Sequence, residues 1–309
     1  MKEQFKAPDT EPTGVLIVHK HAGATSHDIV NKIRRLYGTR RVGHTGTLDP
    51  MATGVLVVLV GRAAKASEYL ASDRKQYRAI LRLGLTTDTE DVTGEVLTKA
   101  DRLPSLSEVE AVLPSFRGKI QQVPPMYSAL KVNGKKLVDL AREGQIIERE
   151  AREIEIFDLQ MTATDTPSDY NLTVTCSGGT YIRTLCADIG TRLGCGGVMA
   201  ALERTEACGF SIAQAHTVDA LECLSEEERR ALLIPTEKLF ATLPKIQISE
   251  FHQRLIRSGC AVQQKKLKFS FPLGARLRIA DSNGNFFAIG EVVEADGDLA
   301  VKSIKLFVL

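Results

Sequence analysis

The stretch Gly43–Gly54, with the sequence GHTGTLDPMATG, is the segment around which the rest of the chain can be interpreted. It holds three glycines, one histidine and one aspartate, and it continues into the apolar run Val55–Val60, which ends at another glycine. An apolar run of this length between glycines is typical of a buried strand. Because Pro50 disfavours helical angles at the residue before it, we expect a stiff loop that presents the Asp49 carboxylate at the mouth of a sheet. The structural alternative is a short helix that begins at Pro50 and is capped by Thr47 or Asp49.

Strand and helix patterns lie on both sides of this loop. Gly14–Lys20 has the pattern of an apolar strand, and Thr25 opens a capping box before a helix that stops near Gly38. Lys75–Gly84 alternates as a strand, with Tyr77 on its apolar face. Tyr77 is therefore either a core residue or, at the start of its strand, a residue of the site.

Arg183 stands in the first turn of another predicted helix, which Ser177–Arg183 opens and which runs to about Leu193. A cation in that position opposes the helix dipole, so it needs an anion close by. Asp188 is the local candidate for this anion, and Asp49 is the candidate that would create a reactive site.

The charge of the chain indicates a nucleic-acid partner only locally. The net charge over 309 residues is +2, which is too small to predict nucleic-acid binding by itself. Five cations without an acid nevertheless stand just before the glycine-rich loop, namely Lys32, Arg34, Arg35, Arg40 and Arg41. Such a cluster is either a solvated surface or a contact for RNA phosphates.

Cysteine and histidine usage argues for a metal-free cytoplasmic protein. The six cysteines form no Cys-x-x-Cys pair and no secretion signal opens the chain, which is typical of reduced cytoplasmic thiols. His19 and His21 offer the closest histidine spacing, and we expect no metal site there. The apolar runs fall short of the roughly 20 residues that cross a bilayer, so we expect no membrane association.

Pattern changes along the chain predict two domains. Residues 1–13 are polar and are expected to form a flexible tail, and residues 14–240 form the larger domain. The pattern weakens between Ile234 and Leu243, which predicts a linker. Residues 245–309 contain one helical segment, Glu250–Arg257, and several short strands, as in a small β-barrel.

Four motifs between Gly14 and Phe210 resemble the TruB family, the bacterial tRNA pseudouridine synthases that convert the T-loop uridine at tRNA position 55. Their presence together, in this order, is more specific than any one of them. They are Gly43–Pro50, the Tyr77 strand followed by Thr86–Thr89, Val123–Ala129, and Gly179–Leu185. The resemblance implies an α+β fold in which residues 14–240 form a pseudouridine synthase catalytic domain on a mixed, mostly antiparallel sheet. It implies that residues 245–309 form a PUA-like RNA-binding β-barrel.

The resemblance also implies roles for individual residues. Asp49 matches the family's catalytic aspartate, Arg183 the arginine paired with it, and Tyr77 the tyrosine that stacks on the target base. The residues that match RNA-contacting or pocket positions are His44, which would fill the gap left by the flipped base, Lys20, Tyr181 and Leu202. We add Arg40 and Arg41 as expected phosphate contacts.

Two departures from the family pattern concern the surroundings of the aspartate. His21 follows Lys20 where the family has proline, and Glu203 stands where the family has arginine. Both changes affect expected RNA contacts more than the reaction itself.

Pseudouridine formation exchanges no electrons and adds no group, so we expect no cofactor, in agreement with the lack of a P-loop or dinucleotide motif. Asp49 could attack C1′, remove a proton from C2′, or stabilise positive charge on the sugar. We expect Arg183 to keep Asp49 ionised and oriented. The expected partner is the T-arm stem-loop of tRNA, bound by a monomer. The alternatives are a non-catalytic RNA-binding or RNA-folding protein on the same scaffold and a nucleoside glycosidase, which would need a second carboxylate.

Overall fold

The computed structural model describes residues 11–70, 74–132 and 134–307. Most of the predicted tail, residues 1–13, lies outside these ranges. Its last three residues pack against the domain, because Pro12 is buried and the Glu11 carboxylate accepts hydrogen bonds from Thr39 and Arg41.

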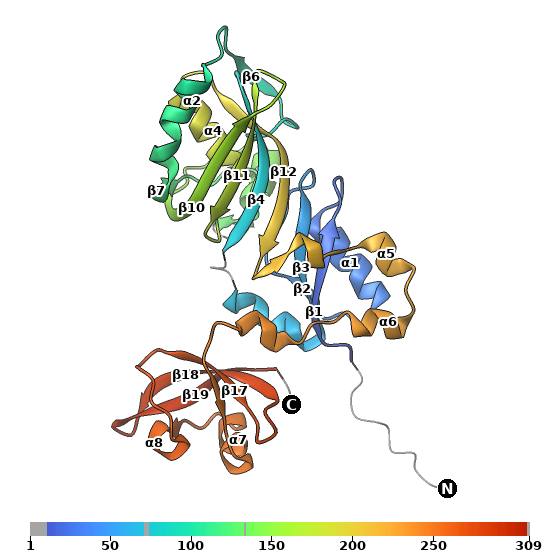
Figure 1. The fold of residues 1–309 in the computed structure, drawn as a ribbon, viewed down its shortest axis with the longest axis vertical. Helices are drawn as coiled ribbons and strands as arrows, with labels where there is room; N and C mark the ends of the chain where they lie inside the picture. The colour runs from blue at the N-terminus through green and yellow to red at the C-terminus, as the bar shows by residue number, and fades with distance from the viewer. Residues whose placement is uncertain (1–10, 71–73, 133, 308–309) are drawn as a thin grey trace.

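One large sheet organises the chain up to the C-terminal domain (Figure 1). Its strands are β1 (Gly14–Lys20), β2 (Val42–His44), β3 (Thr53–Val60), β4 (Lys75–Leu83), β7 (Gly118–Gln122), β10 (Arg152–Ala163), β11 (Asp169–Cys176), β12 (Gly197–Ala207), β13 (Phe210–Ser211) and β14 (His216–Thr217). The strand order is β14-β1-β3-β12-β4-β11-β10-β7, with β2 paired to β3 and β13 to β12. The pairing is antiparallel except for β1 with β14 and β3 with β12, so the expected mixed, mostly antiparallel sheet is present.

Helices and two small hairpins surround this sheet. The α-helices are α1 (Ser26–Leu36), α2 (Leu106–Val112), α3 (Leu137–Arg142), α4 (Ile182–Arg192), α5 (Val218–Glu222) and α6 (Glu226–Ala231). The 3-10 helices are η1 (Gly61–Tyr69), η2 (Leu113–Phe116), η3 (Ile212–Gln214) and η4 (Thr236–Phe240), and the hairpins are β5 (Leu85–Thr87) with β6 (Val96–Lys99) and β8 (Lys131–Val132) with β9 (Lys135–Lys136).

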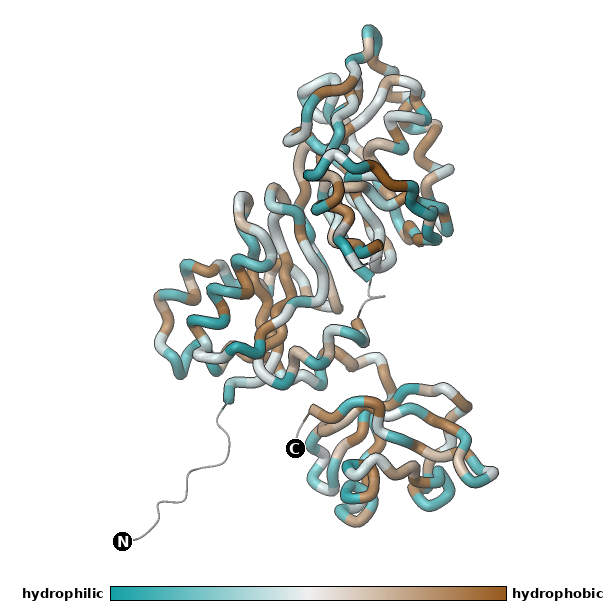
Figure 2. Tube along the Cα trace, turned by 180° about the vertical axis from the view of Figure 1, so that it is seen from behind, coloured by the Kyte–Doolittle hydropathy of each residue, from teal (hydrophilic) through white to brown (hydrophobic). Residues whose placement is uncertain are grey.

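The elements that the sequence predicted owe their structure to local signals. The Thr25 side chain and the Asp28 carboxylate cap the start of α1 reciprocally, as the capping box predicts. The Val and Leu side chains of β3 are fully buried, because the strand lies inside the sheet with β1 and β12 on either side. Seen from behind, hydrophobic segments follow these central strands (Figure 2). On β4, Tyr77 and every second residue after it are buried, as the alternation predicts.

Strand β12 holds the two halves of the sheet together. It is antiparallel to β4, where Arg204 is the partner of Tyr77, and parallel to β3, where Arg204 is the partner of Gly54. Gly54 has φ +97°, and a Cβ atom added to it would lie 2.3 Å from the carbonyl oxygen of Arg204. Only glycine therefore fits at this crossing point.

The C-terminal domain is a half-barrel, because its five strands follow one open path within the described residues. It contains β15 (Lys245–Gln247), β16 (Val262–Gln263), β17 (Arg276–Ala280), β18 (Phe286–Ala295) and β19 (Asp298–Leu306), in the order β15-β17-β18-β19-β16, together with α7 (Glu250–Arg257) and α8 (Gln264–Leu267). Helix α7 follows β15 and packs near β16 and β19, where Ile256 joins the domain core. The helix covers apolar surface that barrel closure would otherwise bury.

The segment predicted as a linker is structured and partly buried. Within Ile234–Leu243, helix η4 places Leu239 and Phe240 in a hydrophobic cluster shared with the large domain. The Phe240 ring lies 6.0 Å from that of Phe286 and 5.7 Å from that of Phe307. Lys65 and Tyr69 of η1 also donate hydrogen bonds to carbonyl groups of β19. The weak sequence periodicity therefore marks a packed junction between the domains.

Candidate active site

Asp49 lies on the loop that leads into β3. The loop forms a turn in which the Ala52 amide donates to the Asp49 carbonyl at 3.0 Å, and no helix begins at Pro50. The helix-cap alternative is therefore wrong for this segment. The Asp49 side chain is 31% exposed, so the carboxylate keeps an open side although its partner is buried.

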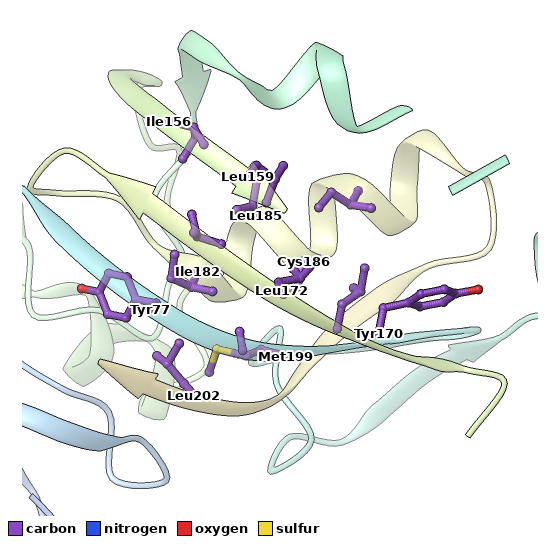
Figure 3. Close-up of a cluster of buried hydrophobic side chains, with 14 of the residues drawn as sticks. Tyr77, Ile156, Leu159, Tyr170, Leu172, Ile182, Leu185, Cys186, Met199 and Leu202 are labelled. Atoms are coloured by element: carbon purple, nitrogen blue, oxygen red, sulfur yellow. The ribbon is translucent and has the colours of Figure 1, made fainter. Parts of the chain in front are cut away.

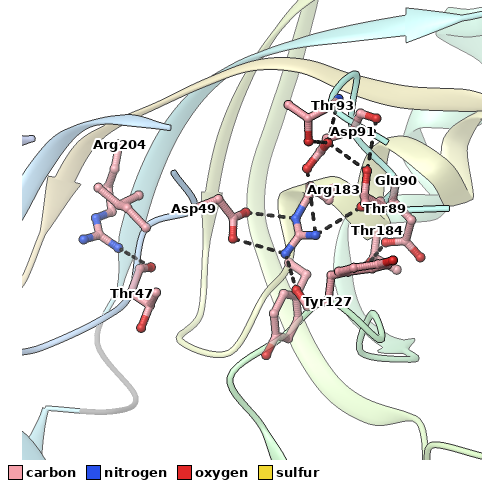
Figure 4. Close-up of polar contacts among 12 residues, drawn as sticks. Thr47, Asp49, Thr89, Glu90, Asp91, Thr93, Tyr127, Arg183, Thr184 and Arg204 are labelled. Atoms are coloured by element: carbon pink, nitrogen blue, oxygen red, sulfur yellow. Dashed lines mark hydrogen bonds and ion pairs between the residues drawn. The ribbon is translucent and has the colours of Figure 1, made fainter. Parts of the chain in front are cut away.

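The Arg183 guanidinium holds both oxygen atoms of this carboxylate. Its Nε lies 2.9 Å from Asp49 Oδ2, and its Nη2 lies 3.2 Å from Oδ1 (Figure 4). Arg183 belongs to the first turn of α4, and its side chain is 5% exposed. The anion that the position of Arg183 requires is Asp49 and not Asp188, and the two-point contact fixes the plane of the carboxylate.

Three groups on the far side of Arg183 hold the guanidinium in place. Nη1 donates to the Thr89 carbonyl at 3.1 Å, and Nη2 donates to the Tyr127 carbonyl at 2.8 Å. Asp91 is buried and lies 3.9 Å from Nη1. Asp91 is in turn bound by the hydroxyl groups of Thr89 and Thr93.

The sequence did not indicate these contacts with Arg183. Asp91 and Thr89 belong to the acid- and threonine-rich segment after β5, and their position more than 90 residues before Arg183 gave no sign of the contact. Next to them, Glu90 adopts a left-handed conformation with φ +62° and accepts a hydrogen bond from Thr184 at 2.6 Å.

Opposing effects act on the pKa of Asp49. Partial burial raises the pKa of the Asp49 carboxyl above its usual value, and the neighbouring Asp91 adds to this rise, whereas Arg183 lowers the pKa. Arg183 therefore favours the ionised form of Asp49, as expected from the sequence, although the net shift of the pKa is upward.

Three other predicted site residues are Tyr77, Leu202 and Tyr181. Figure 3 shows Tyr77 and Leu202 at one end of the hydrophobic cluster that also contains Ile182. Burial raises the pKa of the Tyr77 phenol, and the Arg204 cation beside it counteracts this effect. Tyr181 caps α4, and its backbone exchanges two hydrogen bonds with the Gln122 side chain.

Lys20, by contrast, is enclosed by backbone carbonyl groups. Its side chain is fully buried and donates to the carbonyl groups of His21, Pro50 and Ala52 at 3.0, 3.1 and 2.6 Å. Burial lowers the pKa of Lys20 to about 8, although Asp49 favours its charged form. Lys20 thus lies at the expected loop and supports it, but its side chain is not exposed for the RNA contact expected from the sequence.

The other residues predicted to contact RNA are His44, Arg40 and Arg41, and the two arginines lie far from Asp49. His44 is on β2, accepts a hydrogen bond from the Gly46 amide at 3.3 Å, and has a pKa lowered by burial and by Arg204. Arg40 and Arg41 are exposed beyond the Val60 end of β3, whereas Asp49 precedes the Thr53 end. Eight strand residues at about 3.3 Å each separate these ends by roughly 25 Å. Arg41 is also paired with Glu11.

The described residues contain neither a metal-binding cluster nor a membrane-spanning helix. The His, Cys, Asp and Glu side chains within residues 11–70, 74–132 and 134–307 form no group of three that could hold a metal ion. None of the helices in these ranges is long and apolar enough to cross a membrane.

Comparisons with known proteins agree with this geometry. Residues 34–182 match the family model described as TruB family pseudouridylate synthase (N terminal domain). Residues 183–241 match the model described as tRNA pseudouridylate synthase B C-terminal domain. Curated proteins named tRNA pseudouridine synthase B are 41% identical to the chain. The one from Stutzerimonas stutzeri aligns over 97% of this chain and 98% of its own length, and the one from Pseudomonas aeruginosa over 94% and 95%.

Solved structures show the same fold. A Cbf5-Nop10-Gar1 complex contains a chain that matches with a TM-score of 0.72 and 25% identity, covering 96% of this chain and 85% of that one. A chain in an H/ACA RNP bound to a substrate RNA containing 2'-deoxyuridine matches with a TM-score of 0.71 and 22% identity, covering 97% and 86%.

Proposed function

Because the chain belongs to the TruB family of pseudouridylate synthases, we propose that it converts the uridine at position 55 in the T loop of tRNA to pseudouridine. The observation that carries this proposal is the Asp49 carboxylate, which is oriented by Arg183 and remains open on one side. Pseudouridine synthesis requires a glycosidic bond to break and a carbon–carbon bond to form at C1′ of the same ribose. An ionised carboxylate next to the sugar suits this chemistry.

The arrangement supports a division of labour among the site residues. Asp49 acts on the sugar, either as a nucleophile at C1′, as a base at C2′, or by stabilising positive charge on the ring. Tyr77 and Leu202 offer an aromatic and an apolar surface to the uracil after it leaves the loop. His44 occupies the space in the RNA that the uracil vacates. These contacts offset the few kcal/mol that extrusion of a base typically costs.

The partner is the T-arm stem-loop, because RNA loops offer bases that are already partly unstacked. The C-terminal domain then binds tRNA outside this arm, in the manner of a PUA domain. The protein works as a cytoplasmic monomer without a cofactor.

The test is to incubate purified protein with unmodified tRNA and to map pseudouridine by nucleotide. We expect modification at position 55 with the wild-type protein and none with Asp49→Asn, which keeps the size of the side chain but removes its charge. Binding of tRNA by the Asn variant should persist. Modification by the Asn variant at the wild-type rate would disprove the role of Asp49. Binding without any modification by the wild-type protein would instead support the non-catalytic RNA-binding alternative.

A further inference from the structure

Arg204 is the largest fully buried side chain of the described residues, and its guanidinium donates hydrogen bonds to backbone carbonyl groups. It is 1% exposed, which excludes direct contact with RNA. A buried cation is costly unless its donors are satisfied, so its partners indicate why the chain retains it.

The donors of Arg204 reach both ends of the loop that carries Asp49. Its Nη2 donates to the Gly46 carbonyl at 3.0 Å, and its Nη1 lies 3.5 Å from the Thr47 carbonyl, both before Asp49. Its Nε donates to the Val55 carbonyl at 2.7 Å, after Asp49. One rigid guanidinium therefore ties the incoming and outgoing chain of the loop to β12.

The same residue is tied to the surface on which the base would rest. Arg204 is the cross-strand partner of Tyr77 in the pairing of β12 with β4. On its other side it is the partner of Gly54 in β3. Figure 4 shows Thr47 and Arg204 on one side of Asp49 and Arg183 on the other. Arg183 orients the carboxylate itself, whereas Arg204 binds carbonyl groups of the backbone that carries Asp49 and lies beside the Tyr77 phenol.

We propose that Arg204 is a positioning residue that fixes the distance between Asp49 and Tyr77 by holding the loop Gly46–Val55 against the strand pair β4 and β12. The inference rests on the proposed function, because the two groups must meet one uridine at the same time. Small errors of position are expensive in such an arrangement, since a misplacement of about 1 Å can reduce a rate by about 100-fold.

The test compares Arg204→Met, Arg204→Lys and a matched control, Arg117→Met. Arg117 also donates from a guanidinium to a backbone carbonyl, that of Leu159, but it lies near the other edge of the sheet. Arg204→Met should lower the single-turnover rate about 100-fold at saturating tRNA, with the dissociation constant for tRNA unchanged. Arg204→Lys should recover part of this loss, because one ammonium can reach one of the carbonyls but not both ends of the loop. Arg117→Met should behave as wild type.

Amide hydrogen exchange supplies a readout that does not depend on activity. In both Arg204 variants, amides of residues 45–55 should exchange faster, while those of β10 and β11 stay protected. A wild-type single-turnover rate in Arg204→Met, or unchanged exchange of the loop in a variant that has lost activity, would refute the proposal. If Arg204→Met does not fold, Arg204→Lys decides by the same two measurements. If the wild-type protein forms no pseudouridine, the proposed function is disproved. The hydrogen-exchange result would still test whether Arg204 holds the loop.

Discussion

Replacement of Arg183 by lysine separates the geometry of the active site from its charge. The guanidinium now makes two contacts with Asp49 and one each with the Thr89 and Tyr127 carbonyls. A lysine ammonium is a single point of charge, so it can bind one Asp49 oxygen atom but cannot hold the carboxylate plane. A hydrogen bond to a charged group contributes about 1.5–3 kcal/mol. Loss of the second bond alone should lower the rate roughly 10- to 150-fold, at 1.36 kcal/mol for each factor of ten.

The assay is single-turnover pseudouridine formation with enzyme in excess, measured across a pH series. Arg183→Lys should show the lower plateau rate, but its acidic limb should stay close to that of wild type because a cation remains. Arg183→Met removes the group that opposes the raised pKa of Asp49, so that pKa should rise further. The Asp49 carboxylate would then become protonated at a higher pH. The acidic limb of the pH profile should therefore shift to higher pH.

Arg82→Lys is the matched control for this experiment. Arg82 also binds a carboxylate through two nitrogen atoms, with Nε 2.9 Å and Nη2 2.7 Å from the oxygen atoms of Asp169, in the same sheet but away from Asp49. Arg82→Lys should leave the rate of pseudouridine formation and its pH profile unchanged. An unaltered plateau rate in Arg183→Lys would refute the argument that the two-point contact orients Asp49. An equal loss in Arg82→Lys would show that the assay reports general damage to the sheet.

Three further predictions follow from buried contacts. Lys20→Met should lower the single-turnover rate at least about tenfold without changing tRNA affinity, because Lys20 binds carbonyl groups of the loop that carries Asp49. A loss of tRNA affinity without a loss of rate would instead support an RNA contact by Lys20. Gly54→Ala should lower the free energy of unfolding by about 2 kcal/mol or more, measured by urea denaturation. Gly43→Ala should have little effect, because a Cβ atom added to Gly43 meets no atom within 4 Å. Phe240→Ala should lower the free energy of unfolding by about 3–5 kcal/mol, and the exposed Phe251→Ala should not; equal effects would contradict the packed junction.

The parts of the fold that could be predicted are those specified by neighbouring residues. Strand β3 is an uninterrupted apolar run between glycines, and α1 carries its own cap, so both are recognisable without knowledge of the rest. Strand β12 was missed because its residues 200–203, Ala-Ala-Leu-Glu, favour a helix. Its place between β3 and β4 overrides this preference, and such a pairing is a property of the whole sheet.

The active site was predictable to the same limited extent. Asp49, Tyr77 and Arg183 indicated pseudouridine formation, because motifs that resemble those of the TruB family contain all three residues in this order. The roles of Lys20 and Arg204 could not be recognised, since both cations bind backbone carbonyls, which every residue possesses and no sequence pattern marks. The upward net shift of the Asp49 pKa could not be predicted either, because burial depends on the packing of the complete loop.

The narrow contact between β3 and β12 has a mechanical consequence. These strands pair at two registers, those of Glu203 and Arg204, and this contact joins the half of the sheet with β1 and β3 to the half with β4, β10 and β11. Asp49 belongs to the first half, and Tyr77 and Arg183 belong to the second. A rotation of one half against the other about this contact would displace the reacting groups least, because they lie beside it. We therefore expect the outer ends of the sheet to move farther on RNA binding than Asp49, Tyr77 and Arg183.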